Sequence, residues 1–224
     1  MKTLVIDRST EHTSVVAVSA DGTTQPIDLG IWNDTHHPTA DTQHPTTPSS
    51  LSPNHSSLIT HHSSLTSLSA LNSQLSTILV GTGPGSFAGI RSALAFAQGC
   101  AVGCGCEVLG LTSAAAYARQ DEPVAVVGDA RRGKFWIALF DGYRLVTDIF
   151  QVERDELGKR VPRGIAVLSP DWKRISAILT DVFGDVAAPA PEMDSAALWR
   201  VASANPSLLK REPLPIYLNP AVRD

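Results

Sequence analysis

The sequence contains no hydrophobic run that approaches the length of a membrane-spanning helix, and Asp7 interrupts its first apolar stretch. Cysteine is also scarce. The chain has three cysteines among 224 residues, and an odd number argues against a disulfide framework. These absences predict a cytoplasmic protein with no membrane span and no signal peptide.

Basic residues are also fewer than acidic ones. The chain carries 18 Lys and Arg against 22 Asp and Glu, a net charge of −4, so its surface as a whole does not attract nucleic acid. No Lys, Arg or Glu occurs between Glu11 and Arg91, and residues 129–134 form the only dense basic run. Any contact with RNA would therefore need a local basic patch or a basic partner.

Residues 35–77 have an unusual composition, because Ser, Thr, Pro and His make up about two thirds of them. Four prolines exclude a continuous helix up to about residue 53, and we predict a flexible loop over 33–54, of which residues 35–54 are dispensable for folding. Leucines then recur at near-helical spacing between Leu58 and Leu75. This pattern predicts a Ser-rich amphipathic helix that needs a surface to pack against.

Histidine and cysteine do not form a metal-binding pattern. Six of the seven histidines lie between residues 36 and 62, and no two of them are four residues apart on one helix. The cysteines Cys100, Cys104 and Cys106 stand among small residues without a nearby histidine, which favours packing over ligation. We therefore predict no metal site in this chain.

The pattern of apolar residues predicts a chain of the α/β class, and its 43% hydrophobic content is enough for a sizeable core. The expected strands cover 2–7, 13–19, 24–31, 76–81, 107–111, 123–129, 134–140, 143–150 and 164–168. The expected helices cover 90–103, 112–120, 170–183 and 194–204. The half that begins at 123 repeats the layout of the half that begins at 2.

The sharpest motif is a glycine-rich turn, residues 83–91, between an expected strand and an expected helix. Its members Gly83, Pro84, Gly85, Ser86, Phe87, Gly89 and Arg91 could bind an anion through backbone N–H groups. The motif also fits a loose dinucleotide fingerprint, but Glu107 precedes its strand where the ribose-binding acid should follow it. We favour a structural turn in which Gly85 or Gly89 adopts a backbone conformation that a side chain would strain. Ser86 lacks the frame of a nucleophile elbow.

Two further clusters could carry chemistry. Asp7, Ser9 and Thr10 follow the first strand, where a carboxylate and hydroxyls could hold a metal-bound phosphate. A turn acid with capping hydroxyls is an equally good interpretation. Asp129 and Arg131 belong to the basic run 129–134, which could contact phosphate or an acidic protein but is also typical of a solvated turn. No catalytic triad can be identified.

Together these motifs resemble the TsaB family, also called YeaZ-like proteins. Residues 83–91 resemble the Gly-Pro-Gly-Ser-Phe-Thr-Gly-x-Arg signature, with Ala88 in place of Thr. Residues 4–7 resemble the opening strand of the family, although Arg8 replaces Thr, and residues 129–136 resemble its Asp-Ala-Arg hairpin. His55 to Leu58 and Pro215 to Leu218 resemble a helix start and the closing motif, with Asn219 in place of Arg.

The resemblance implies an actin-like fold, related to sugar kinases and heat-shock chaperone ATPases, with two related α/β domains and mixed sheets. We expect the first domain to span 1–111 with the tail 206–224, and a smaller second domain to span 112–205. The resemblance also implies a non-catalytic subunit that pairs with a TsaD-type enzyme for threonylcarbamoylation of the tRNA adenosine next to the anticodon. A TsaE-like ATPase would join this complex, and ATP and metal would belong to the partner subunits.

The resemblance places the partner interface on the Ser-rich helix, at Leu58, Ile59, His62 and Leu65, where the helix would meet TsaD or a second copy in a homodimer. Asp7, Ser9, Thr10, Asp129 and Arg131 would form a vestigial nucleotide site. Two alternatives stay open at this point. The chain could be an independent nucleotide-binding or phosphotransfer enzyme of the actin-like class, or a peptidase.

Overall fold

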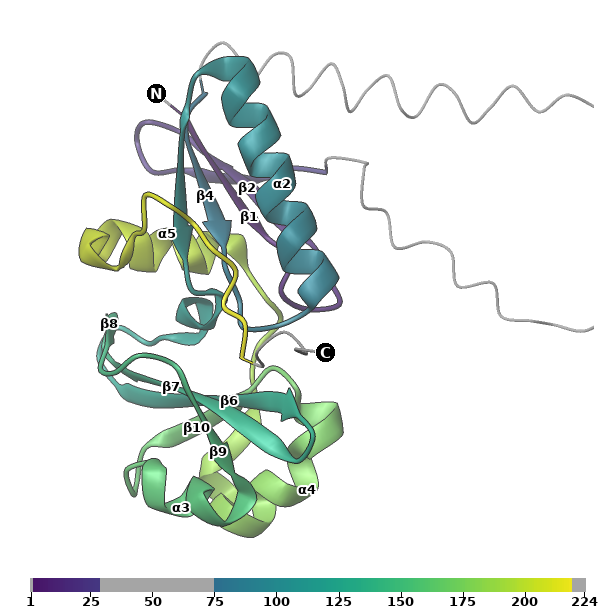
Figure 1. The fold of residues 1–224 in the computed structure, drawn as a ribbon. Helices are drawn as coiled ribbons and strands as arrows, with labels where there is room; N and C mark the ends of the chain where they lie inside the picture. Colours follow the sequence, from purple (N-terminus) through teal and green to yellow (C-terminus); the bar gives the residue numbers. More distant parts are fainter. Residues whose placement is uncertain (1, 29–74, 219–224) are drawn as a thin grey trace, which may run out of the picture.

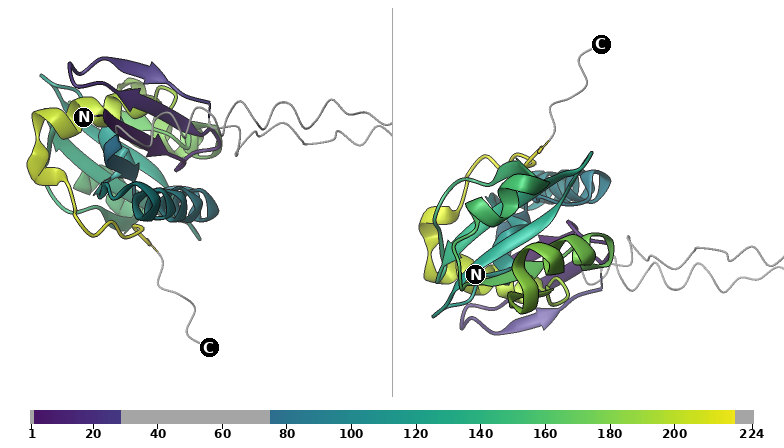
Figure 2. Two further views of the ribbon diagram at one scale, coloured as in Figure 1. Left: turned by 90° about the horizontal axis from the view of Figure 1, so that it is seen from above. Right: turned by 90° about the horizontal axis from the view of Figure 1, so that it is seen from below.

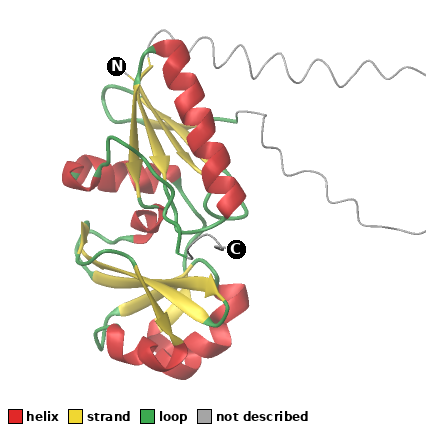
Figure 3. Ribbon diagram, viewed as in Figure 1, coloured by secondary structure: helices red, strands yellow, loops and turns green. Residues whose placement is uncertain are grey.

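Two mixed β-sheets, each covered by helices, form the framework of the protein (Figures 1 and 3). The computed structural model describes residues 2–28 and 75–218. The first sheet has the order β3-β2-β1-β4-β5, with β1 Lys2–Asp7, β2 Ser14–Val18, β3 Thr24–Pro26, β4 Leu75–Gly81 and β5 Glu107–Leu111. The second has the order β11-β10-β6-β7-β8, with β6 Pro123–Arg131, β7 Lys134–Asp141, β8 Arg144–Leu145, β10 Ala166–Ser169 and β11 Ala187–Pro189. Strand β9, Phe150–Glu153, pairs with β7 outside this order.

The helices pack on both faces of these sheets. The α-helices are α2 Phe87–Cys104, α3 Leu157–Arg160, α4 Trp172–Phe183 and α5 Ser195–Ala204. The 3-10 helices are η1 Ser113–Tyr117, η2 Arg154–Glu156, η3 Gly184–Val186 and η4 Pro206–Leu208. We call the first sheet with α2, η1 and α5 the first lobe, and the second sheet with α3 and α4 the second lobe.

Three apolar clusters follow from the alternation of side chains along the strands. Leu4 and Ile6 face α2 on one side of the first sheet, whereas Val5 faces the other side. That other side shares a continuous core with η1, α5 and one face of the second sheet. The third cluster joins the far face of the second sheet to α3 and α4. Figures 1 and 2 show α2 and α5 on opposite faces of the first sheet.

The two sheets repeat one topology. β1 pairs antiparallel with β2 and parallel with β4, and β4 pairs parallel with β5. In the same way, β6 pairs antiparallel with β7 and parallel with β10, and β10 pairs parallel with β11. The predicted fold class, with two mixed α/β units of related layout, is confirmed.

Some predicted elements differ from the structure. The strand expected over 143–150 is two short strands, β8 and β9, and the helix expected over 112–120 is the short 3-10 helix η1. Helix α5 packs against η1, β1 and β2, so it lies with the first sheet, although the expected boundary grouped it with the second domain. The predicted loop over 33–54 and the predicted helix over 58–75 fall outside the described residues, except for Leu75 itself.

Helix α2 corrects the expectation that no stretch of the chain approaches the length of a membrane-spanning helix. By length and apolarity alone it could cross a membrane, although the core helix of a soluble protein passes the same test. In the structure its Ile90, Ala93, Leu94 and Ala97 side chains are buried against the first sheet. Helix α2 therefore covers one face of the first sheet.

Candidate functional site

The end of strand β1 places Asp7 at the centre of a buried polar network. The Asp7 side chain is fully buried. Its Oδ1 accepts hydrogen bonds from the Ser9 amide at 2.8 Å and the Ser9 hydroxyl at 2.6 Å, and its Oδ2 accepts one from the Ser113 hydroxyl at 2.5 Å. Both carboxylate oxygens are thus engaged by the protein itself, as a buried charge requires.

The glycine-rich turn is tied to this network by its backbone. The Gly83 amide donates to the Ser113 hydroxyl at 2.9 Å, and the Gly83 carbonyl accepts from the Ser113 amide at 2.8 Å. The Ser86 amide donates to the Ser9 carbonyl at 2.6 Å, and the Gly89 amide donates to the Ser86 hydroxyl, which caps α2. Pro84 has no N–H group. Several of the groups that an anion would need are therefore already used.

The glycines in this turn are required for a different reason from the one predicted. Gly83 has a φ of 91°, in the left-handed region, whereas Gly85 and Gly89 do not. A Cβ on Gly85 would overlap the Ser9 carbonyl, and a Cβ on Gly89 would overlap the carbonyl of Arg8. A side chain at Gly85 or Gly89 would thus be disfavoured by steric overlap, because the turn lies directly against the loop after β1. These contacts favour the structural interpretation of the turn.

Burial controls the electrostatics of this region. Desolvation raises the pKa of the Asp7 carboxyl above its ordinary value, and the hydrogen bonds from Ser113 and Ser9 counteract part of this rise. The Tyr117 hydroxyl is buried nearby and has no hydrogen-bond partner among the described residues. Burial raises the pKa of Tyr117, and the charges of Asp7 and Asp171 raise it further. Tyr117 therefore stays protonated between the acids of the two lobes.

The second lobe has its own acidic cluster at the tip of the β6–β7 hairpin. Asp129 Oδ2 lies 3.3 Å from the guanidinium of Arg131 and 3.3 Å from that of Arg174. The Asp129 amide donates to Asp171 at 2.8 Å, and Arg174 also pairs with Asp171. Burial raises the pKa of Asp171, while the Asp129 amide and Arg174 lower it. Each carboxylate of this cluster is thus paired with a guanidinium of the same cluster.

The C-terminal segment crosses from one lobe to the other beside the glycine turn. The Lys210 amide and carbonyl pair with Gly110 on the edge of the first sheet, and the Ile216 amide donates to the Thr82 carbonyl at 2.9 Å. The side chain of Gln151, on β9, donates to the Leu218 carbonyl. Figure 1 shows this segment in yellow, running past β4 toward the second sheet. The segment therefore joins both sheets.

The sequence-predicted site residues fall into two groups. The structure brings Asp7 and Ser9 together with the glycine turn, whereas the Thr10 hydroxyl donates to the His12 carbonyl in an exposed loop. Asp129 and Arg131 form the separate cluster of the second lobe. The predicted interface residues Leu58, Ile59, His62 and Leu65 lie outside the described residues.

Sequence reasoning missed four members of these networks, Ser113, Tyr117, Asp171 and Arg174. A Ser shortly after a strand is too common a signal to reveal a contact with a residue 106 positions away.

No group of three or more His, Cys, Asp or Glu in the described part of the chain could hold a metal ion. The Cys104 and Cys106 sulfurs lie 3.1 Å apart, and Cys104 also donates to the Cys100 carbonyl. Burial, with the hydrogen bond between the Cys104 and Cys106 sulfurs, raises the pKa of the Cys106 thiol to about 12, so it is protonated at neutral pH.

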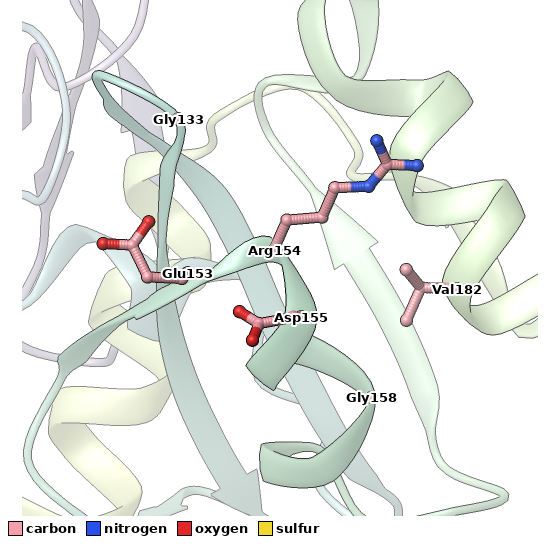
Figure 4. A pocket seen from close by; sticks show the side chains of 6 residues that line it. All are labelled: Gly133, Glu153, Arg154, Asp155, Gly158 and Val182. Atoms are coloured by element: carbon pink, nitrogen blue, oxygen red, sulfur yellow. The ribbon is translucent and has the colours of Figure 1, made fainter.

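A surface pocket of about 550 Å³ lies at the far side of the second lobe (Figure 4). Its lining consists of Gly133, Glu153, Arg154, Asp155, Gly158 and Val182. Two of its charged side chains form ion pairs with neighbours, since Arg154 pairs with Asp181 at 3.0 Å and Glu153 pairs with Lys134 at 3.1 Å. Figure 4 shows Arg154 extending toward the helix that carries Val182. None of the sequence-predicted site residues lines this pocket.

Comparisons with known proteins identify the family. The family described as TsaD, tRNA N6-adenosine threonylcarbamoyltransferase, matches residues 39–171, which is more than half of the chain. The chain belongs to this family. A search of curated proteins found no match to the sequence.

Solved structures extend the likeness to nearly the whole chain. YeaZ from Pseudomonas aeruginosa matches with a TM-score of 0.66 and 18% identity, over 97% of this chain and 99% of that chain. A crystal structure of an uncharacterized protein with similarity to peptidase YeaZ from Pseudomonas aeruginosa matches with a TM-score of 0.64 and 19% identity, over the same shares. At such identities the likeness shows the fold, and the predicted YeaZ-like architecture is confirmed.

Proposed function

We propose that this member of the TsaD family is a TsaB-type subunit without a catalytic centre of its own. It binds a TsaD-type catalytic partner and activates threonylcarbamoylation of the tRNA adenosine next to the anticodon. A TsaE-like ATPase joins the complex in the cytoplasm, and ATP and metal are held by the partners. The order of motifs along the chain, the family match and the YeaZ-like fold support this proposal.

The state of Asp7 is the observation that carries the non-catalytic part of the proposal. An acid that holds a metal-bound phosphate must present at least one oxygen to the ligand. Here both Asp7 oxygens accept hydrogen bonds from Ser9 and Ser113, and the side chain is fully buried. The loop after β1 also fills the inner side of the glycine turn at Gly85 and Gly89. This arrangement suits a rigid scaffold better than a phosphate-binding cradle.

Reconstitution with the partner tests the proposal. The chain is first used to isolate a TsaD-type protein from extracts of its own cells. We expect the pair with a TsaE-like ATPase to modify tRNA, and omission of this chain to abolish the product. The isolated chain should bind no ATP and cleave no peptide. ATP binding that is lost in Asp7→Ala would instead support the phosphotransfer alternative, and failure to bind any TsaD-type protein would contradict the proposal.

The position of the interface has its own test. Sequence reasoning places Leu58, Ile59, His62 and Leu65 against the partner or a second copy. A charge at the centre of an apolar interface must be desolvated without a counter-charge, so Ile59→Glu should abolish association. Circular dichroism controls for folding, and ultracentrifugation reports association. If the folded variant still binds TsaD with native affinity, the interface lies elsewhere.

A further inference from the structure

Two aromatic rings and a guanidinium gather at the first turn of α2, and most of this surface faces solvent. Phe87 and Tyr217 keep 58% and 54% of their surface exposed. Their ring centroids lie 5.4 Å apart at an interplanar angle of 36°, and the Arg91 guanidinium lies 5.1 Å from the centre of the Phe87 ring. We call Phe87, Arg91 and Tyr217 the aromatic patch. Contiguous exposed apolar surface, unlike single scattered side chains, can mark a binding site.

The aromatic patch is held in place from both sides. Phe87 opens a helix that is capped by Ser86, and the turn before it is packed against the loop after β1. Tyr217 follows Ile216, whose amide donates to the Thr82 carbonyl, and precedes Leu218, whose carbonyl accepts from Gln151. The two rings come from segments 130 positions apart in the sequence and still meet. Little conformational entropy therefore remains to be lost when a ligand stacks on them.

The charges around the patch favour an anionic ligand. Arg91 is the only charged residue of α2, and the first turn of this helix carries no acidic residue. A second guanidinium, that of Arg8, reaches this end of the helix and donates to the Ser92 hydroxyl at 3.1 Å. Two guanidinium groups thus lie at this end of α2, on a chain whose net charge is −4.

We propose that the aromatic patch binds an unstacked base of single-stranded RNA, with Tyr217 and Phe87 as the stacking surface and Arg91 at the neighbouring phosphate. Single-stranded RNA is recognised in this way, by aromatic faces together with arginine. The inference rests on the proposed function, because the substrate adenosine there lies in the anticodon loop, whose bases can be unstacked. It gives this subunit a direct contact with tRNA.

A protein partner would need more apolar surface than the patch supplies. A stable interface buries about 800 Å² on each side around an apolar centre. Beyond Phe87, the exposed residues of α2 are mostly small or polar, and the other large exposed apolar side chain, Val102, lies near the far end of the helix. A protein contact is nevertheless the outcome that the experiment must separate from RNA binding.

The experiment compares variants that remove the aromatic face or the charge with variants that keep them. The probe is a fluorescent anticodon stem–loop RNA, titrated into the full chain alone and into its complex with the TsaD-type partner. Tyr217→Leu removes the aromatic face and should weaken RNA binding about tenfold, within the range for one stacked base. Tyr217→Phe should bind as the wild type does. Val102→Ala, at a side chain that is 90% exposed at the other end of α2, is the matched control and should also change nothing.

Two further readouts identify the contact. A 2-aminopurine in the loop should lose fluorescence on binding the wild type and not on binding Tyr217→Leu, because stacking quenches it. Arg91→Gln should weaken binding several-fold and reduce its dependence on salt, since a phosphate contact is lost. All variants should keep the melting temperature of the wild type within about 2 °C, because these side chains are more exposed than buried.

The outcomes separate this inference from the proposed function. If the wild type binds no RNA, or if Tyr217→Leu binds it with native affinity, the inference is wrong even where the pair still modifies tRNA. If Tyr217→Leu loses affinity for the TsaD-type partner and keeps its affinity for RNA, the patch is a protein contact and the inference is again wrong. A chain that associates with no TsaD-type protein contradicts the proposed function, and RNA titration of the chain alone then decides the inference.

Discussion

Replacing Ser113 by alanine is the sharpest perturbation of the buried network. The Ser113 hydroxyl donates to Asp7 Oδ2 at 2.5 Å and accepts from the Gly83 amide at 2.9 Å. Ser113→Ala therefore removes a hydrogen bond to a buried carboxylate, which contributes about 1.5–3 kcal/mol. It also leaves a buried amide without an acceptor, which costs about 1–3 kcal/mol. We expect a loss of roughly 3–5 kcal/mol in the free energy of unfolding.

The loss should depend on pH in a defined direction. Burial raises the pKa of Asp7 in the folded state, and the hydrogen bond from Ser113 lowers it. Without that hydrogen bond the folded-state pKa rises further, so the folded variant binds a proton more readily than the folded wild type does. The variant's extra instability is fully present above the folded pKa of Asp7. It shrinks as the pH falls through that value, because the protonated acid no longer needs the same donors.

Urea unfolding at pH 7 and at about pH 4 measures both effects. Ser76→Ala is the matched control, since Ser76 makes one hydrogen bond, to the Lys2 carbonyl at 3.3 Å, and it is only part-buried. We expect this control to lose less than about 1 kcal/mol, with little change between the two pH values. At pH 7, Ser113→Ala should also melt roughly 10 °C below the wild type. A loss no larger than that of Ser76→Ala, or one that grows toward acid pH, would refute the reasoning.

Three further predictions concern single side chains. Gly85→Val should cost roughly 1–3 kcal/mol and lower the melting temperature, because the new Cβ overlaps a backbone carbonyl; a stable variant that lost only complex activity would mark the turn as a binding loop. Tyr117→Phe removes a buried hydroxyl without a partner among the described residues, so urea unfolding should show a gain of about 1 kcal/mol, and a loss would reveal a hidden partner. Arg174→Met breaks partly exposed ion pairs with Asp129 and Asp171, so urea unfolding should show a loss of at most about 1 kcal/mol. Because Arg174 lowers the pKa of Asp171, NMR titration of Arg174→Met should find that pKa raised, and an unchanged value would contradict the pairing.

Local pattern was sufficient for most of the fold. The run Leu4 to Ile6 alternates between two apolar environments and was predicted as a buried strand, as it is. The hairpin of β6 and β7 was visible because a short turn separates two apolar runs. The glycine turn was placed correctly because Gly and Pro restrict the backbone in recognisable ways. Each of these signals lies within one short continuous segment of the chain.

The remaining features depend on contacts between distant segments, which no local pattern encodes. The partner of Asp7 is Ser113, and the reason for Gly85 is the Ser9 carbonyl, a contact that only the folded chain reveals. The packing of α5 on the first sheet was missed for the same reason, since its apolar face would suit either sheet equally well. The meeting of Phe87 with Tyr217 likewise could not be predicted from two separate motifs.

The discontinuity of the first lobe has a consequence for synthesis on the ribosome. All strands of the second sheet lie between residues 123 and 189, in one uninterrupted stretch. The first sheet, by contrast, receives α5 and the segment that pairs at Gly110 only after that stretch has emerged. The part of the chain that is made first is therefore the part that is completed last. Until then, one apolar face of the first sheet lacks its cover, which makes the nascent chain most exposed to chaperones during this interval.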